Sequence, residues 1–132
     1  MISDTRYLFE SDAFPPVPGE DDETNPGICG RALAAWLADA LGLAGYVVER
    51  IVAEDFGRVL VLAHPGCRLH VAVASTDESG RAWQVFAFAE YGLLARLRRS
   101  SGDASAISQL MSDLKRVLEE SADVKSLREA PT

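Results

Sequence analysis

The chain has 132 residues, 48% of them hydrophobic and 25% charged, which fits one globular domain and is too apolar for a disordered protein. Its formal net charge of −7 disfavours binding to nucleic acid, since that binding depends on clustered lysine and arginine. The first residues lack the pattern of a signal peptide and no apolar run is long enough to span a membrane, so we expect a cytoplasmic protein with no membrane partner.

Residues 1–24 are expected to form an acidic, proline-rich lead-in, followed by an α+β body at residues 25–132 of the same domain. The apolar residues within 3–10 leave open a short first strand. Prolines 15, 16 and 18 then exclude a helix or a regular strand. The acidic run at residues 20–23 lies just ahead of an expected helix, and we expect it to be a solvated loop.

A helix is predicted to follow, with Asn25 as its N-cap and Pro26 at its first position. Its apolar residues recur at helical spacing: Leu33, Trp36, Leu37, Ala40 and Leu41. Gly30 would lie inside this helix, which suggests a close approach to a strand. Trp36 is expected to be buried as the anchor of that contact, and the helix is expected to end within residues 42–45.

Period-two patterns predict four strands joined by short turns, at residues 46–52, 58–63, 68–74 and 82–89. A last helix is predicted from one apolar stripe, made by Ile107, Leu110, Met111, Leu114, Val117 and Leu118. Residues 122–127 could add a short edge strand. The expected fold is an α+β two-layer sandwich, in which an antiparallel meander of four to six strands carries both main helices on one face.

Alternation along the last strand of the meander places Trp83, Val85 and Ala87 on one side and Phe86 and Phe88 on the other. If the helices cover only the Trp83 side, Phe86 and Phe88 form an aromatic patch on the opposite face. That patch is either closed by the N-terminal segment or used for a partner.

The only basic cluster of the chain is Arg96, Arg98 and Arg99. Its guanidinium groups could bind a carboxylate or a phosphate, or pair with the acidic lead-in within the chain or across a dimer. The plainer interpretation is a solvated connector whose arginine stems lie over apolar surface. Phe86, Phe88 and the three arginines are the candidate partner-binding residues.

His64, Cys67 and His70 superficially resemble a set of metal ligands. Cys67 and His70 are three residues apart, however, so on a regular strand they point to opposite faces. Core packing of Cys67 and a surface position of His70 explain the string more simply. We therefore predict no metal and no cofactor.

Cys29 lies near the expected helix start, where the positive end of the helix dipole would lower the pKa of its thiol. Glu54 and Asp55 at a tight turn could form a carboxylate pair for acid–base work. Neither histidine is placed as a base for Cys29, and core packing at a helix–sheet contact is the simpler interpretation of this residue. Turn formation accounts for the two acids. We assign no catalytic residue, and both cysteines are expected to be reduced.

The segment from residue 23 to 38, ETNPGICGRALAAWLA, and the turn EDFG at residues 54–57 resemble a family of small uncharacterised bacterial proteins. The resemblance covers most of the chain. In that family the turn usually reads Glu-Asp-Trp-Gly-Trp, so Phe56 and Arg58 stand at its aromatic positions. The family has no assigned activity, and the resemblance implies one intact bacterial domain.

These observations together predict a non-enzymatic, acidic protein-interaction module that binds a protein client or a second copy of itself. A secretion chaperone and a toxin-neutralising immunity protein are concrete forms, by analogy of class. The alternative is a small-molecule-binding domain or small enzyme with a pocket near Cys29, Glu54 and Asp55.

Overall fold

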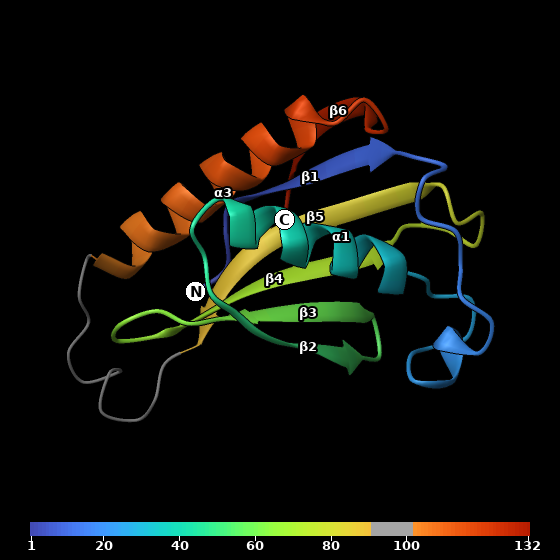
Figure 1. Ribbon diagram of the computed structural model, residues 1–132, viewed down its shortest axis with the longest axis horizontal. Coiled ribbons are helices and arrows are strands. Elements are labelled where there is room, and N and C mark those ends of the chain that lie inside the picture. Colours follow the sequence, from blue (N-terminus) through green and yellow to red (C-terminus); the bar gives the residue numbers. More distant parts are fainter. Residues whose placement is uncertain (91–101) are drawn as a thin grey trace.

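A computed structural model describes residues 1–90 and 102–132 as one sheet with two main helices (Figure 1). In chain order the elements are β1 (Thr5–Glu10), the 3-10 helix η1 (Glu20–Asp22), α1 (Arg31–Leu43), β2 (Val48–Glu54), β3 (Gly57–Leu62), β4 (Arg68–Ser75), β5 (Ala82–Glu90), α3 (Gly102–Glu120) and β6 (Lys125–Pro131). The four strands predicted between residues 46 and 89 are confirmed, with small shifts at their ends.

All six strands form one sheet in the order β2-β3-β4-β5-β1-β6, and every neighbouring pair is antiparallel. The predicted meander is therefore confirmed as β2 to β5. The first strand, which the sequence left open, lies inside the sheet because Tyr7 and Phe9 are buried under the helices. The C-terminal segment pairs with it as the edge strand β6.

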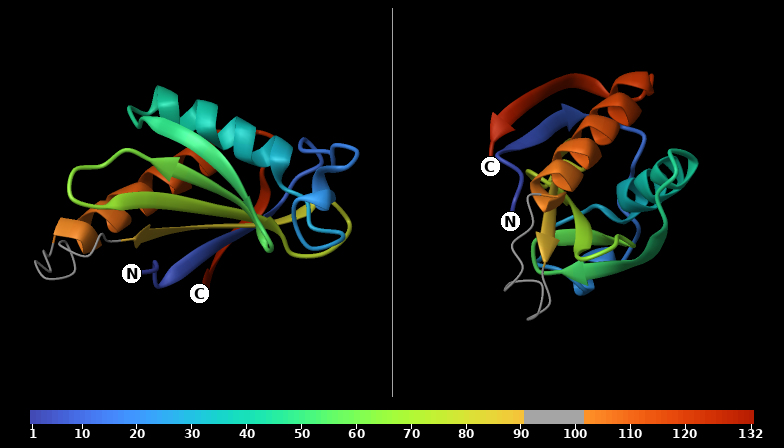
Figure 2. Two further views of the ribbon diagram at one scale, coloured as in Figure 1. Left: turned by 90° about the horizontal axis from the view of Figure 1, so that it is seen from below. Right: turned by 90° about the vertical axis from the view of Figure 1, so that its left-hand side faces the viewer.

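Both helices pack on the same face of the sheet, which curls around them (Figures 1 and 2). Helix α1 lies over β2 and β3, and α3 lies over β5. Each helix buries one apolar stripe completely, formed by Leu33, Leu37 and Leu41 in α1 and by Leu110, Leu114 and Leu118 in α3. The predicted α+β sandwich is confirmed. No helix within the described ranges is long and apolar enough to cross a membrane.

Helix α1 begins five residues later than predicted. Asn25 is not its N-cap but part of a turn in which the N–H of Ile28 donates to the Asn25 carbonyl at 3.1 Å. Gly30 is the N-cap and precedes the helix, because its φ of 154° is not helical. The predicted close approach to a strand is confirmed, since a Cβ on Gly30 would lie 3.5 Å from the carbonyl oxygen of Val73.

The acidic run at residues 20–23 includes the 3-10 helix η1. The prediction of a solvated loop is wrong for Glu20, which is buried, whereas Asp22 and Glu23 are exposed. Glu20 is 4% exposed and accepts hydrogen bonds from the N–H groups of Gly30 at 2.8 Å and Arg31 at 3.2 Å. Its carboxylate thus caps α1 in place of the side chain that Gly30 lacks. Glu23 forms an ion pair of 2.6 Å with Arg58, whose side chain is buried.

The buried tryptophan is Trp83 and not Trp36. Trp83 is 1% exposed, and its indole N–H donates to the carbonyl of Ser11 at 3.2 Å. Trp36 is only partly buried at the edge of the core. The ring of Phe14 lies between the two, with centroid distances of 5.4 Å to Trp36 and 6.3 Å to Trp83. The prediction that Trp36 is the sealed anchor is therefore wrong.

Candidate functional site

The side of the sheet that faces away from α1 and α3, here called the open face, carries the aromatic patch expected from the sequence. Strand register aligns its residues in two rows. One row contains Arg50, Val61, His70 and Phe88, and the next contains Val52, Val59, Ala72 and Phe86. Trp83, Val85 and Ala87 lie on the other side in the core. The predicted separation of Phe86 and Phe88 from Trp83 is confirmed.

Three aromatic rings are in contact on this face. The ring centroids of Phe86 and Phe88 lie 6.3 Å apart, and those of His70 and Phe88 lie 4.7 Å apart. Both phenylalanines keep part of their surface exposed, whereas His70 is buried. The expectation that His70 lies at the surface is therefore wrong. Its contact with Phe88 depends on the pairing of β4 with β5, which the sequence does not specify by itself.

The N-terminal segment does not close the patch, because it continues the sheet beside β5. The N–H of Ser3 donates to the carbonyl of Ala87 at 2.9 Å, and the N–H of Ala89 donates to the carbonyl of Met1 at 2.8 Å. The two main helices lie on the other face and the six strands form the sheet itself (Figure 2). Within residues 1–90 and 102–132, neither main helix packs over Phe86 and Phe88, which are partly exposed. The neighbouring side chains on this face are buried: Val59, Val61, His70 and Ala72.

Two polar atoms on the open face are buried without a hydrogen-bond partner: Nε of Arg6 and Nδ1 of His70. They are the only such side-chain atoms in the part of the chain that the structure describes. Buried polar groups in proteins are nearly always bonded, so each exception needs an explanation. His70 contacts the ring of Phe88, and Arg6 bonds to Gln84, which lies two positions before Phe86 on β5.

The surroundings of His70 favour its neutral form. Burial lowers the pKa of His70, and the positive charges of Arg68 and Arg50 lower it further, while the carboxylate of Glu90 opposes them. A neutral imidazole can offer one ring nitrogen as an acceptor or a donor to a molecule that covers it.

A pocket of about 220 Å³ adjoins the patch where β1, β5 and β6 lie side by side. Arg6, Leu8 and Arg128 contribute to its lining from the open face, together with Glu10 and Ala82. Nη1 of Arg6 donates to Oε1 of Gln84 at 2.7 Å, which leaves Nε as the unpaired donor. No local sequence pattern indicates this pocket, because its two arginines come from opposite ends of the chain.

Arg96, Arg98 and Arg99, the other candidate partner-binding residues, lie outside the described residues. Their assignment stays a prediction.

Cys29 belongs to the core cluster, as its simpler interpretation predicted. It is 8% exposed, and burial together with the carboxylates of Glu20 and Asp21 raises the pKa of its thiol. The expectation of a lowered pKa is wrong because Cys29 is buried ahead of α1, close to the carboxylates of Glu20 and Asp21. Glu54 and Asp55 are exposed beside the β2–β3 turn.

His64 and Cys67 are neighbours, with 3.4 Å between Nδ1 and Sγ. Cys67 belongs to the core cluster, whereas His70 lies on the open face next to Phe88. The prediction that Cys67 and His70 point to opposite faces is confirmed. Among the residues that the structure describes, no three His, Cys, Asp or Glu side chains are grouped as metal ligands.

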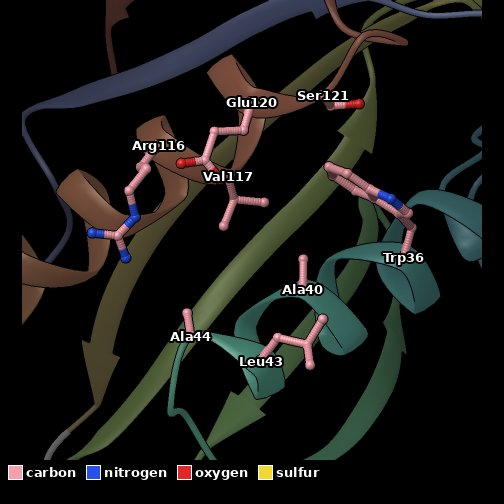
Figure 3. A pocket seen from close by; sticks show the side chains of 8 residues that line it. All are labelled: Trp36, Ala40, Leu43, Ala44, Arg116, Val117, Glu120 and Ser121. Carbon is pink, nitrogen blue, oxygen red and sulfur yellow. The ribbon is translucent and has the colours of Figure 1, made fainter.

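A second surface lies between the helices, on the other side of the molecule (Figure 3). This interhelical groove has a volume of about 540 Å³. It is lined by Trp36, Ala40, Leu43, Ala44, Arg116, Val117, Glu120 and Ser121. Leu43 is 93% exposed, and the Arg116 guanidinium is already paired with Asp113 at 2.8 Å. The groove therefore lacks the unpaired polar atoms of the open face.

No protein-family model, curated protein or solved structure matches this chain. The resemblance to small bacterial proteins stays a prediction.

Proposed function

We propose that the protein is a non-enzymatic interaction module that binds a protein client through its open face. The observation that carries this proposal is the position of two unpaired buried polar atoms, Arg6 Nε and His70 Nδ1, on the same face as the partly exposed rings of Phe86 and Phe88. A covering partner would bury the exposed parts of Phe86 and Phe88. Arg6 Nε and His70 Nδ1 are shielded from solvent by the protein itself, so the partner would bond to them only after a shift of their side chains.

The composition of the open face supports the same proposal. Aromatic residues and arginine are enriched at the centres of protein interfaces, where a few of them carry most of the binding energy. A secretion chaperone or an immunity protein is a concrete form of such a module, acting in the cytoplasm. The raised pKa and the burial of Cys29 weaken the case for an enzyme built around that thiol.

The experiment compares three forms of the immobilised protein: the parent, Phe86→Asp and Leu43→Asp. Leu43 is the matched control, because it is an exposed apolar residue in the interhelical groove. Captured proteins are quantified by mass spectrometry, and thermal unfolding verifies that each variant is folded. The client is then purified and its affinity for each form is measured by calorimetry.

We expect one client that binds the parent and Leu43→Asp equally and binds Phe86→Asp at least about ten-fold more weakly, since a buried aspartate without a partner is costly. Equal binding by Phe86→Asp, or loss of the client with Leu43→Asp alone, contradicts the proposal. Light scattering measures whether the protein associates with itself. A dimer that dissociates on Phe86→Asp identifies a second copy as the partner.

A further inference from the structure

We propose that Arg6 and Arg128 form a binding pocket for a carboxylate of the client, at the β1–β6 end of the open face. This inference rests on the proposed function and adds the chemistry of the partner. The client would insert an aspartate or glutamate side chain between the two guanidinium groups and place its neighbouring apolar residues against Leu8 and Phe86.

The strand register brings the two arginines together. Arg128 is paired directly with Leu8, and Arg6 is paired with Ala130, so Arg6 and Arg128 are diagonal neighbours on one face of the sheet. Diagonal positions on antiparallel strands are about 7–8 Å apart, which long side chains can bridge. Both arginines line the same pocket of about 220 Å³. That volume can hold a carboxylate and a few carbon atoms, given that one water takes up roughly 30 Å³ in the liquid.

Apart from Nη1 of Arg6, which donates to Gln84, the guanidinium groups of this pair make no hydrogen bond or ion pair with the described residues. The arginines that form ion pairs there are Arg58, Arg81 and Arg116, and neither Arg6 nor Arg128 has a carboxylate within salt-bridge distance. Nε of Arg6 is buried and unpaired, while Nη1 is held by Gln84. A carboxylate in the pocket would accept charge-assisted hydrogen bonds from the exposed Arg128 guanidinium and from the terminal N–H groups of Arg6 that Gln84 does not use.

The charge of the pocket favours a singly charged ligand. Arg6 and Arg128 contribute two positive charges, and the one acid in the lining is Glu10, which is exposed and paired in register with Lys125. Two positive charges and one negative charge give the described lining a net charge of +1, which one carboxylate neutralises. A doubly charged phosphate would leave the site negative in a protein whose net charge is already −7. We therefore infer a carboxylate as the anion.

The test is a titration of the ¹⁵N-labelled protein with phenylacetate, followed by the NMR signals of the Arg6 Nε–H and the backbone N–H of Leu8 and Arg128. Phenylacetamide is the matched neutral probe, and inorganic phosphate is the matched anion. We expect the NMR signals to shift in a saturable way with phenylacetate. Phenylacetamide should cause only the small shifts that its aromatic ring produces. Phosphate should bind more weakly than phenylacetate.

The variants Arg6→Gln and Arg128→Gln should each weaken phenylacetate binding by at least about ten-fold, because each removes one charged donor. Arg81→Gln should bind as the parent does, because Arg81 is exposed and paired with Asp12. Arg128 is exposed, so its variant stays informative even if Arg6→Gln does not fold. Equal shifts with phenylacetate and phenylacetamide, tighter binding of phosphate, or unchanged binding by Arg128→Gln would overturn the proposal.

This titration needs no client, so its outcome is separate from that of the capture experiment. A client that depends on Phe86, combined with no response to phenylacetate, refutes the carboxylate pocket and leaves the proposed function standing. If phenylacetate binds and Phe86→Asp captures the client as well as the parent does, the pocket is supported and the proposed function is refuted.

Discussion

Glu20 replaces the missing N-cap side chain of α1, so its removal should destabilise the protein. Its carboxylate accepts backbone hydrogen bonds from Val17 at 2.6 Å, from Gly30 at 2.8 Å and from Arg31 at 3.2 Å. It also places negative charge at the positive end of the helix dipole. The change Glu20→Ala leaves all three donors without this acceptor.

The expected cost follows from the surroundings of these donors. Val17 and Arg31 are exposed, so water can replace the carboxylate there, whereas Gly30 is buried. A buried N–H left unpaired costs about 1–3 kcal/mol, and loss of a helix cap costs about 0.5–2 kcal/mol. We expect Glu20→Ala to lower the free energy of unfolding by about 2–4 kcal/mol. Glu20→Gln keeps one carbonyl oxygen and should cost roughly half as much.

Urea unfolding followed by circular dichroism measures these changes. The control is Asp22→Ala, which removes the same charge from the same acidic run. Asp22 is exposed, and its side chain makes no hydrogen bond or ion pair with the described residues, so this change should stay within about 0.5 kcal/mol of the parent. Equal stability of Glu20→Ala and Asp22→Ala would refute the capping role and restore a solvated acidic loop.

Three further results are expected. Trp83→Ala should lower the free energy of unfolding by about 3–5 kcal/mol and Trp36→Ala by less, because only the first indole is sealed; calorimetry showing the reverse order would contradict this. NMR titration should place the pKa of Glu23 below its ordinary value of 4.5, because Arg58 donates a hydrogen bond to the carboxylate. A carboxyl group with a lowered pKa stabilises the fold above pH 4.5 and loses this effect as pH falls through the lowered pKa, so Glu23→Gln should differ from the parent only at the higher pH. Cys29 should react slowly with a disulfide reagent until urea unfolds the chain, and rapid labelling of the folded protein would disagree with its burial.

The strands and the two faces of the sheet could be predicted because their signals are local. Successive side chains on a strand point to opposite faces, so within residues 82–89 the separation of Phe86 and Phe88 from Trp83 follows from the period of two alone. Short turns between consecutive strands then fix the antiparallel meander. The apolar stripes of the two helices likewise require only neighbours three or four residues away.

The start of α1 could not be predicted, because its capping group is distant in sequence. Asn25 and Pro26 have the local chemistry of a helix N-terminus, yet the carboxylate that caps the helix belongs to Glu20. The available signal was Gly30 itself, directly before the apolar stripe, since glycine tolerates the positive φ that this position adopts.

The arginine pocket was missed for a related reason. Arg6 and Arg128 are separated by nearly the whole chain, and they meet only because β1 is an interior strand with β6 at its edge. Which tryptophan is sealed also depends on such contacts, since Ser11 and Phe14 from the lead-in close over Trp83. Local periodicity indicates that both tryptophans face the core, and it does not indicate which of them is more deeply buried.

Photo-crosslinking in the cell that makes the protein tests the role of the open face most directly. Benzoylphenylalanine is placed at position 88 in one form and at position 43, in the interhelical groove, in another. The account predicts an adduct of one defined mass from position 88, none of that mass from position 43, and loss of the adduct when Phe86→Asp is added. An adduct from position 43 alone, or an adduct from position 88 that persists with Phe86→Asp, would contradict it.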